Sequence, residues 1–262
     1  MNKPQGAFAL ITGASKGLGK AIAIELAERG YNLILVARSG TALSELSTKL
    51  QAAYGVTAHH FAIDLAVITS VDHLINWIQD NGICVSILVN NAGFGLWGKF
   101  SSLSIADQLE MSRLNIDAVV KLSHALIPNL QDQQRAYILN ISSTAAYQAL
   151  PTLAIYAATK AFILSFSRAL RFELKNTHIS VSCLCPGPIN TGFATRAGLD
   201  AFSKMAEKFN MQADEVAKIG LNGMFNNKPE IIPGLANKIS AFATRILPKS
   251  FIEKTAAGIY KT

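Results

Sequence analysis

The 262-residue sequence predicts one α/β domain, built on a doubly wound parallel sheet of about seven strands with helices on both faces. Two observations predict this fold class. Short apolar, β-prone runs alternate with helix-length segments along most of the chain, as expected for parallel strands joined by helical crossovers. The polar motifs follow the expected strands, and ligands of such sheets bind beyond the carboxyl ends of the strands. No repeat, linker or low-complexity segment suggests a second domain in residues 1–262.

The expected strands are apolar runs bounded by glycine, asparagine, aspartate or proline. They lie at residues 7–12, 32–37, 56–63, 84–89, 137–142 and 178–184, with a short seventh strand at 228–233. Helical spacing of apolar residues places helices between them. These helices cover about residues 18–29, 42–53, 71–79, 103–126, 152 onward, 193–210 and 213–225, and an apolar helical stripe begins at residue 235.

A glycine-rich loop, TGASKGLG at residues 12–19, joins the first strand to the first helix. Strand, glycine loop and helix N-terminus stand in the order that phosphate binding needs. Gly13 permits the tight turn, Gly17 lets the backbone approach a pyrophosphate, and Gly19 lets the helix pack closely on the strand. The alternative is an ordinary turn with scattered glycines. The position of the loop favours a Rossmann-like, dinucleotide-binding fold. The other loop residues expected at the cofactor are Ser15, Lys16 and Leu18.

The second expected strand ends at Arg38, where a dinucleotide fold places the adenosine ribose. An acidic residue there binds the free 2′-hydroxyl of NAD, whereas an arginine suits the 2′-phosphate of NADP. Lys16 of the glycine loop adds a second positive charge. The alternative is two solvated surface cations. Because both residues fall where a 2′-phosphate would bind, we expect NADP(H) as the cofactor.

Tyr156 and Lys160 stand four residues apart after a turn at Pro151, so they share one face of the following helix. The charge of a neighbouring lysine favours phenolate and lowers a tyrosine pKa from its usual value of about 10, so that the phenol can pass a proton near neutral pH. Ser143, at the end of the preceding strand, is placed to donate a hydrogen bond to the same substrate oxygen. Taken alone, the pair is more simply explained by an amphipathic helix that carries both residues by chance.

Composition limits the partners and the compartment. The net charge is +7, but the 24 Lys and Arg residues are scattered without a basic run, so we expect a phosphate-bearing ligand and no nucleic-acid partner. The three cysteines are an odd number without metal-ligand spacing, which indicates a reduced, cytoplasmic protein without a metal site. Cys183 and Cys185 are interpreted as small buried residues. No run reaches the roughly 18 apolar residues of a membrane span, and the run 7–11 is too short for a signal peptide.

Over about residues 8–191, the motifs resemble the classical short-chain dehydrogenase/reductase family in order and spacing. The loop at 12–19 matches its TGxxxGxG motif, and NNAG at residues 90–93 matches a second motif. Ser142 and Ser143 are both candidate serines, and the family's spacing to the tyrosine selects Ser143. The residues that match the catalytic tetrad are Asn115, Ser143, Tyr156 and Lys160.

The resemblance implies a role for each residue. Tyr156 is the general acid in reduction and the base in oxidation, Ser143 orients and polarises the carbonyl, and Lys160 holds the nicotinamide ribose. Asn115 supports a water that links Lys160 to solvent. The residues expected at the adenine are Asp64 and Leu65. Further cofactor contacts are expected at Asn91, Ala92, Gly93, Pro186, Gly187, Ile189 and Thr191, the last two at the carboxamide.

The end of the chain departs from the family pattern, since KPEIIPG at residues 228–234 replaces a common VDGG segment and a long helical tail follows. The tail resembles a DltE-like branch. Residues 193–225 are expected to form a lid over the substrate, and residues 235–262 a helical tail. Its apolar stripe is predicted to pack on protein, either its own core or a partner subunit of a homo-oligomer, with a membrane surface as the alternative. The stripe consists of Leu235, Ile239, Phe242, Ala243, Ile246 and Leu247.

Three functions are compatible with these features. We expect an oxidoreductase that transfers a hydride between NADP(H) and a small-molecule carbonyl or alcohol, with carbonyl reduction favoured. A dinucleotide-sensing regulator on the same fold is the second function, but a sensor has no need of Ser143 and Tyr156. A membrane-peripheral reductase of lipid carbonyls, held by the basic tail, is the third.

Overall fold

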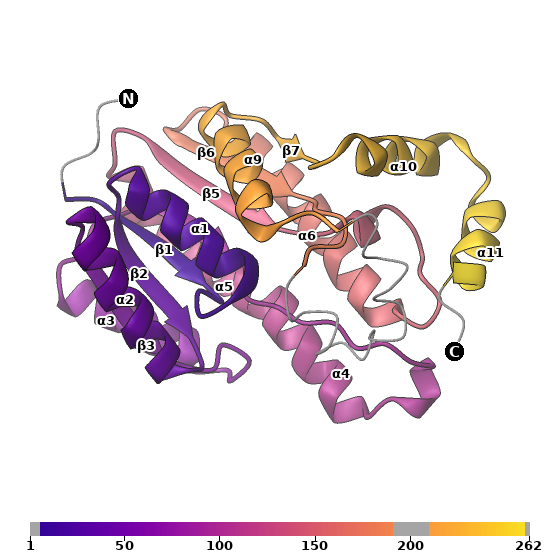
Figure 1. The fold of residues 1–262 in the computed structure, drawn as a ribbon, viewed down its shortest axis with the longest axis horizontal. Helices are drawn as coiled ribbons and strands as arrows, with labels where there is room; N and C mark the ends of the chain where they lie inside the picture. Colours follow the sequence, from indigo (N-terminus) through magenta and orange to yellow (C-terminus); the bar gives the residue numbers. More distant parts are fainter. Residues whose placement is uncertain (1–5, 191–209, 260–262) are drawn as a thin grey trace.

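Seven parallel strands form the central sheet within residues 6–190 and 210–259, the parts of the chain that the computed structural model describes (Figure 1). The strand order is β3-β2-β1-β4-β5-β6-β7, so the chain runs outward from β1, crosses back to β4 and runs outward on the other side. This is the doubly wound sheet that the sequence predicts. The strands are β1 (Phe8–Thr12), β2 (Asn32–Ala37), β3 (Ala58–Ala62), β4 (Val85–Asn90), β5 (Ala136–Ile141), β6 (Ile179–Leu184) and β7 (Glu230–Ile231).

The central strands are apolar throughout because helices cover both faces of the sheet. In β1, Ala9 and Ile11 point into one core layer, and Leu10 points into the other. Cys183 and Cys185 of β6 are both fully buried, with their sulfur atoms 3.8 Å apart. The interpretation of these two cysteines as small core residues is therefore confirmed.

Helices form the two outer layers. The buried faces of α1, α2 and α9 pack on one side of the sheet, and those of α3, α5 and α6 pack on the other. The helices are α1 (Gly17–Glu28), α2 (Gly40–Tyr54), α3 (Ser70–Asp80), α4 (Ile105–Ser112), α5 (Ala118–Gln131), α6 (Ala154–Glu173), α9 (Ala213–Phe225), α10 (Leu235–Ile246) and α11 (Lys249–Ile259).

Most predicted elements lie within two residues of the observed ones. The helix predicted at 103–126 differs, because it consists of α4, a π-helical segment η2 (Arg113–Asp117) and α5, and ends only at Gln131. The π-helical segment contains Asn115, whose side chain bonds to residues far away in the sequence. Apolar periodicity cannot reveal such a segment. The structure also has 3-10 turns at η1 (Phe100–Ser102) and η3 (Thr144–Tyr147). The helix predicted at 193–210 lies outside the described residues, except for residue 210.

The second half of the predicted lid is a core helix. In α9, Val216, Leu221 and Met224 are fully buried in the same layer as α1. Arg29, just beyond α1, donates a hydrogen bond to Asn222 Oδ1 at 2.8 Å and lies over the Phe225 ring. This part of the chain therefore supports the sheet. Residues 193–209, the rest of the predicted lid, lie outside the described residues.

The tail helix α10 turns its apolar stripe outward. Leu235, Ile239 and Phe242 are exposed, whereas Ala241 on the other side of the helix is buried. The prediction that the stripe packs on the protein's own core is therefore wrong. Periodicity correctly indicated an amphipathic helix, but it cannot say to which side the apolar face turns.

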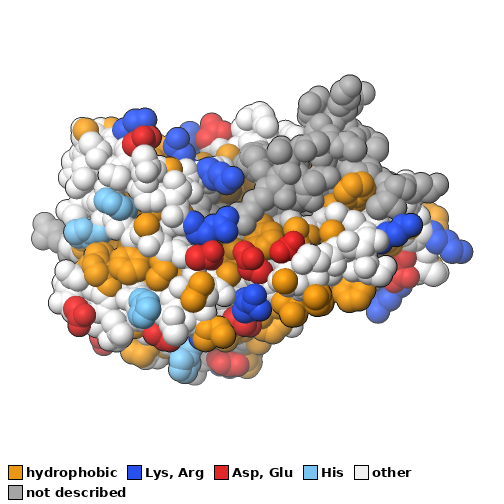
Figure 2. Space-filling view, turned by 90° about the horizontal axis from the view of Figure 1, so that it is seen from below, with side chains coloured by type: hydrophobic (Ala, Val, Ile, Leu, Met, Phe, Trp, Pro, Cys, Tyr) orange, Lys and Arg blue, Asp and Glu red, His pale blue; other side chains and the backbone are white. Residues whose placement is uncertain are grey.

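The surface seen in Figure 2 carries acidic and basic side chains next to one another, with hydrophobic side chains between them. A nucleic-acid-binding face gathers basic side chains, and this face has mixed charge. Among the described residues, no helix has both the length and the apolar character that are needed to cross a membrane.

Candidate active site

The predicted site residues gather at the carboxyl edge of the sheet, around the point where the strand order reverses. The glycine loop follows β1, and the NNAG motif follows the neighbouring β4. Ser143 lies two residues beyond β5, which pairs with β4 on its other side. In a doubly wound sheet, this reversal opens the crevice in which ligands bind.

Two glycines of the loop need their lack of a side chain. Gly13 has φ of 67°, in the left-handed region, and a Cβ there would lie 2.7 Å from Asn91 Nδ2. A Cβ on Gly19 would overlap the carbonyl oxygen of Gly13. The loop therefore passes close to both the NNAG motif and the start of α1. Lys16, the N-cap residue, makes no side-chain cap hydrogen bond, so the helix N-terminus is suited to phosphate oxygens.

Hydrogen bonds of Thr12 and Asn91 join the carboxyl ends of β1 and β4. Thr12 Oγ1 accepts hydrogen bonds from the backbone N–H groups of Asn91 and Ala92, each at 2.9 Å. Asn91 Nδ2 donates to the Thr12 carbonyl oxygen at 2.8 Å. Asn91 and Ala92 thus lie beside the glycine loop, and their hydrogen bonds brace its position.

Asn90, the last residue of β4 and the first of the NNAG motif, bonds the motif to β5 and α5. Its Nδ2 donates to Asn140 Oδ1 of β5 at 2.8 Å and to Ser123 Oγ of α5 at 3.2 Å. Asn140 Nδ2 in turn donates to Ser167 Oγ of α6 at 2.9 Å. This buried polar chain ties the strands of the site to the two helices that carry or support its side chains.

Arg38 stands at the end of β2 with about half of its side chain exposed. Its Nη1 lies 3.6 Å from Asp64 Oδ2 and 4.0 Å from Glu110 Oε1, which are long distances for ion pairs. Exposed pairs of this kind contribute little, so the guanidinium is available to another anion. Leu65, the other predicted adenine contact, is buried. Glu110 near Arg38 was not predicted, since no motif marks it.

Lys160 of α6 is an almost fully buried cation at the end of β5. Its side chain is 6% exposed, and its Nζ donates to the Ile141 carbonyl oxygen at 3.0 Å. Burial lowers the pKa of this ammonium from 10.5 to about 8, a shift that the nearby Cys183 and Cys185 oppose. The Nζ atom lies 5.8 Å from the centre of the Tyr156 ring, so the two residues face each other as the helical spacing predicts.

The two candidate serines have different surroundings. Ser142 is buried, and its Oγ donates to the Lys160 carbonyl oxygen at 2.7 Å, which fastens α6 to the end of β5. Ser143 is half-buried, and its Oγ accepts a hydrogen bond from the Ala145 N–H at 3.1 Å. Ser142 is therefore a structural residue, whereas the Ser143 hydroxyl keeps its proton for another acceptor.

Asn115 is buried in η2 and joins two parts of the site. Its Oδ1 accepts from the Phe94 N–H at 3.1 Å, and its Nδ2 donates to the Phe94 carbonyl oxygen at 3.0 Å and to Thr159 Oγ1 at 3.1 Å. A Cβ on Gly93 would lie 2.8 Å from Asn115 Oδ1 and 3.6 Å from Lys160 Nζ. The amide of Asn115 and the ammonium of Lys160 therefore both lie close to Gly93, where a side chain would collide with the amide.

The turn after β6 borders the site next to the end of β5. The Pro186 carbonyl oxygen accepts from the Thr144 N–H at 2.9 Å, which ties the turn to η3. Ile189 forms a β-bridge with Met211. A Cβ on Gly187 would overlap the side chain of Asn237 from α10, a neighbour that sequence reasoning missed. Thr191 lies outside the described residues.

Comparison with known proteins decides the family. A model of the short chain dehydrogenase family matches residues 7–201. The chain belongs to this family. The predicted resemblance is thus confirmed at the family level, and the protein is an oxidoreductase that transfers a hydride between a nicotinamide dinucleotide and a carbonyl or alcohol.

Individual relatives of this short-chain dehydrogenase differ in substrate and cofactor. The chain is 30% identical to human 17-beta-hydroxysteroid dehydrogenase type 3 over 244 residues, which is 92% of this chain and 78% of that protein. A short-chain dehydrogenase from Sphingobium yanoikuyae in complex with NADPH is 30% identical, with a TM-score of 0.82 and coverage of 91% of this chain and 93% of that one. A relative from Burkholderia phymatum in complex with NAD is 26% identical, with a TM-score of 0.82 and coverage of 92% and 94%.

The described residues fit such a dinucleotide. The close approaches at Gly13 and Gly19 hold the glycine loop and the NNAG motif tightly together at the carboxyl edge of the sheet. The helix N-terminus at α1 and the cation at Arg38 suit the phosphates. The residues that would hold the cofactor therefore run along the carboxyl edge from β2, past β1, to β4 and α6.

Proposed function

We propose that this short-chain dehydrogenase is an NADP(H)-dependent carbonyl reductase in which Tyr156 supplies the proton. The observation that carries the proposal is the position of the buried Lys160 ammonium. It lies at the end of β5, 5.8 Å from the centre of the Tyr156 ring on α6. When bound, the nicotinamide supplies the hydride. The protein must then deliver a proton to the carbonyl oxygen, and a phenol beside a cation is suited to this step.

Lys160 acts on Tyr156 through charge. Its ammonium favours the phenolate that remains after the proton has left, so proton transfer to the substrate oxygen becomes easier. The hydrogen bond to the Ile141 carbonyl oxygen holds the ammonium in place. Asn115 Oδ1 and Lys160 Nζ both lie close to Gly93, and we propose that a water beside them passes protons from solvent.

Ser143 orients the carbonyl. Its Oγ accepts from the Ala145 N–H, an arrangement that leaves its O–H directed at another acceptor. A hydrogen bond to the substrate oxygen strengthens as negative charge develops there during hydride transfer. In this proposal, Ser143 and Tyr156 act on the same substrate oxygen.

The choice of NADPH over NADH rests on Arg38. No carboxylate takes the position at the end of β2, and the guanidinium there has only long contacts to Asp64 and Glu110. A 2′-phosphate would give it a shorter, charge-assisted partner. The exposed Lys16 in the glycine loop adds to the positive charge.

The substrate class and the cellular setting are proposed from a relative and from features outside the site. The human hydroxysteroid dehydrogenase relative suggests a bulky, mostly apolar ketone. The exposed Phe162 and Phe172 of α6 support a homo-oligomer. The free cysteines support a cytoplasmic enzyme, and the helical tail supports a place in the DltE-like branch.

The test is a panel of steroid and other bulky ketones, with loss of NADPH absorbance as the readout. We expect at least one ketone to be reduced faster with NADPH than with NADH. The Tyr156→Phe variant should bind NADPH normally, as judged by fluorescence titration, and turn over on the order of 10²-fold more slowly. A Tyr156→Phe protein that reduces the same ketone at the parent rate would refute the assignment.

A further inference from the structure

The outer face of α10 is apolar, which reverses the usual arrangement of a surface helix. Its four large side chains recur at positions i, i+4, i+7 and i+11 and are 61% to 74% exposed. Two further exposed side chains continue the stripe toward α11. We call the six residues the apolar tail face: Leu235, Ile239, Phe242, Ile246, Leu247 and Phe251.

The inner side of α10 carries small and polar groups. Ala241 is buried, and the Asn237 side chain lies against Gly187 in the turn after β6. Asn237 Nδ2 also donates to the Pro233 carbonyl oxygen at 2.8 Å. The helix is therefore held to the body by small and polar contacts, and its large apolar side chains are left for another surface.

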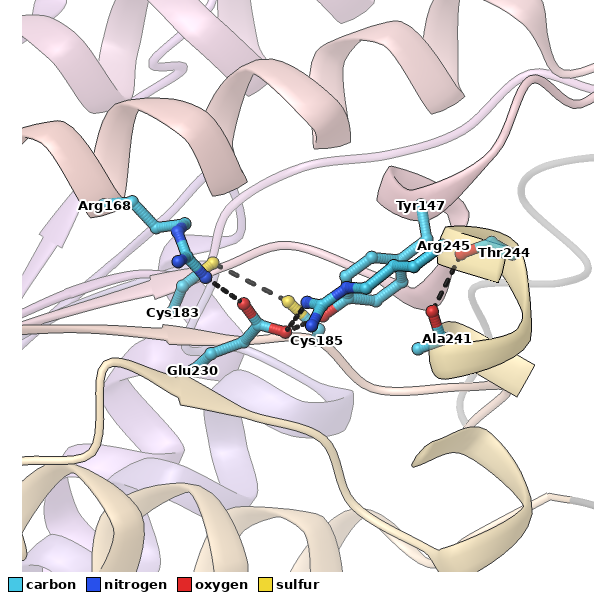
Figure 3. A network of polar contacts seen from close by, with 8 residues as sticks. All are labelled: Tyr147, Arg168, Cys183, Cys185, Glu230, Ala241, Thr244 and Arg245. Atoms are coloured by element: carbon cyan, nitrogen blue, oxygen red, sulfur yellow. Dashed lines mark hydrogen bonds and ion pairs between the residues drawn. The ribbon is translucent and has the colours of Figure 1, made fainter. Parts of the chain in front are cut away.

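Glu230 of β7 locks this orientation (Figure 3). Its carboxylate is largely buried, accepts from Tyr147 Oη at 2.8 Å and pairs with Arg168 Nη1 at 2.7 Å. Arg245 reaches back from α10 to the same carboxylate at 3.2 Å. Rolling α10 to bury its apolar side would break this ion pair. The outward direction of the apolar tail face is thus built into the fold.

The tail is also basic. Residues 235–262 contain five Lys or Arg and one Glu, a net charge of +4 out of +7 for the whole chain. Lys238 is exposed one residue before Ile239, and the exposed Lys249 begins α11. An apolar helix face bordered by cations is the arrangement by which helices bind anionic lipid surfaces.

We propose that the apolar tail face docks on the surface of an anionic lipid membrane, with α10 lying in the plane of the interface. A second copy of the chain fits less well, because a symmetric contact would bring the same basic border together. The area that one face of a 12-residue helix can bury is also smaller than the roughly 800 Å² that each partner of a stable dimer buries. Anionic head groups, by contrast, neutralise Lys238 and Lys249 while the acyl region receives Phe242 and Ile246.

Docking would place the site next to the membrane. Asn237 of the bound helix touches Gly187, which belongs to the turn that closes the site. An apolar ketone dissolved in the bilayer would then reach the enzyme without crossing water, a consequence that rests on the proposed function. The docking itself does not depend on it.

Co-sedimentation of the full chain with lipid vesicles tests the proposal. We expect binding to vesicles that mix phosphatidylcholine with phosphatidylserine, and binding at least about tenfold weaker to phosphatidylcholine alone. The F242S/I246S variant changes two exposed side chains and should bind the mixed vesicles about 10²-fold more weakly. The K238E/K249E variant should lose the preference for anionic vesicles.

The F100S/I105S variant is the matched control. It makes the same two chemical changes at side chains that are 58% and 62% exposed outside the tail, and it should bind as the parent does. Size-exclusion chromatography without lipid tests the second copy as the occupant. Four results would overturn the proposal: no binding of the parent to mixed vesicles, unchanged binding by F242S/I246S, an equal loss in the control, or a dimer that F242S/I246S dissociates without any lipid binding.

Discussion

Replacing Lys160 by methionine should stabilise the folded protein while it abolishes carbonyl reduction. Burial lowers the pKa of Lys160 from 10.5 to about 8. Since each pKa unit corresponds to about 1.4 kcal/mol, keeping this ammonium in the fold costs about 3 kcal/mol. Methionine has a similar length but loses the hydrogen bond to the Ile141 carbonyl oxygen, worth about 1 kcal/mol. The expected net gain is therefore about 2 kcal/mol near neutral pH.

The gain should depend on pH. The folded pKa of Lys160 lies below the unfolded one, so the unfolded chain binds more protons between pH 8 and 10.5. The penalty is fully present below about pH 8 and disappears as the pH rises to about 10.5. The parent should therefore gain stability relative to Lys160→Met across this window. At its alkaline end, the variant should be the less stable protein, because only the lost hydrogen bond counts there.

Urea unfolding of the ligand-free proteins, followed by circular dichroism at about pH 7 and about pH 10, measures the effect. Lys121→Met is the matched control, since Lys121 Nζ also donates to a backbone carbonyl, that of Ile68 at 2.8 Å, but from an exposed site. The control should show no gain. A Lys160→Met protein that is less stable than the parent at pH 7 would refute the reasoning that burial of the ammonium is costly.

Two further predictions concern the cofactor and the serines. Arg38→Asp should raise the KM for NADPH at least about tenfold and leave the KM for NADH little changed, because it replaces a phosphate-binding cation by a repelling carboxylate. Steady-state kinetics with both cofactors checks this prediction. An unchanged preference for NADPH would contradict it. Ser143→Ala should lower single-turnover hydride transfer on the order of 10²-fold, whereas Ser142→Ala should mainly lower the free energy of unfolding, by about 1–2 kcal/mol, through the lost hydrogen bond to Lys160. Equal losses of hydride transfer in the two variants would contradict the different roles of the serines.

The sheet and the location of the site were predictable because both depend on local patterns. Apolar runs bounded by glycine or asparagine mark where strands end, and parallel strands bring their carboxyl ends to one edge. Gly13, Asn91 and Ser143 therefore lie on neighbouring strand ends although they are far apart in sequence. The four-residue spacing of Tyr156 and Lys160 likewise predicted that they face each other.

The partners of buried polar side chains were not predictable. A polar residue within a helix is usually exposed, yet Asn115 is buried and bonded to Phe94 and Thr159. Nothing in the sequence distinguishes a hydroxyl that fastens α6, as Ser142 does, from one that faces a substrate. Such roles arise from contacts between distant segments, and in the sequence only the family's spacing favours Ser143 over Ser142.

The direction of the tail was also beyond the sequence. The apolar stripe predicted a helix at the correct residues, but the helix lies with Arg245 paired to Glu230 and with the stripe turned away from the core. That pair joins two residues whose charges look like ordinary surface charges in the sequence. Periodicity describes one helix, whereas orientation depends on everything that the helix touches.

The position of Glu230 sets an order in which the molecule can be completed. Tyr147, the last residue of η3, finds its hydrogen-bond partner 83 residues later in the chain. During synthesis, the sheet from β1 to β6 can form before this carboxylate leaves the ribosome, but η3 then lacks the contact that ties it to β7 and, through Arg245, to α10. The catalytic edge is therefore finished last. A chain interrupted before β7 would lack the carboxylate that bonds to η3, so nearly complete products of translation should remain inactive.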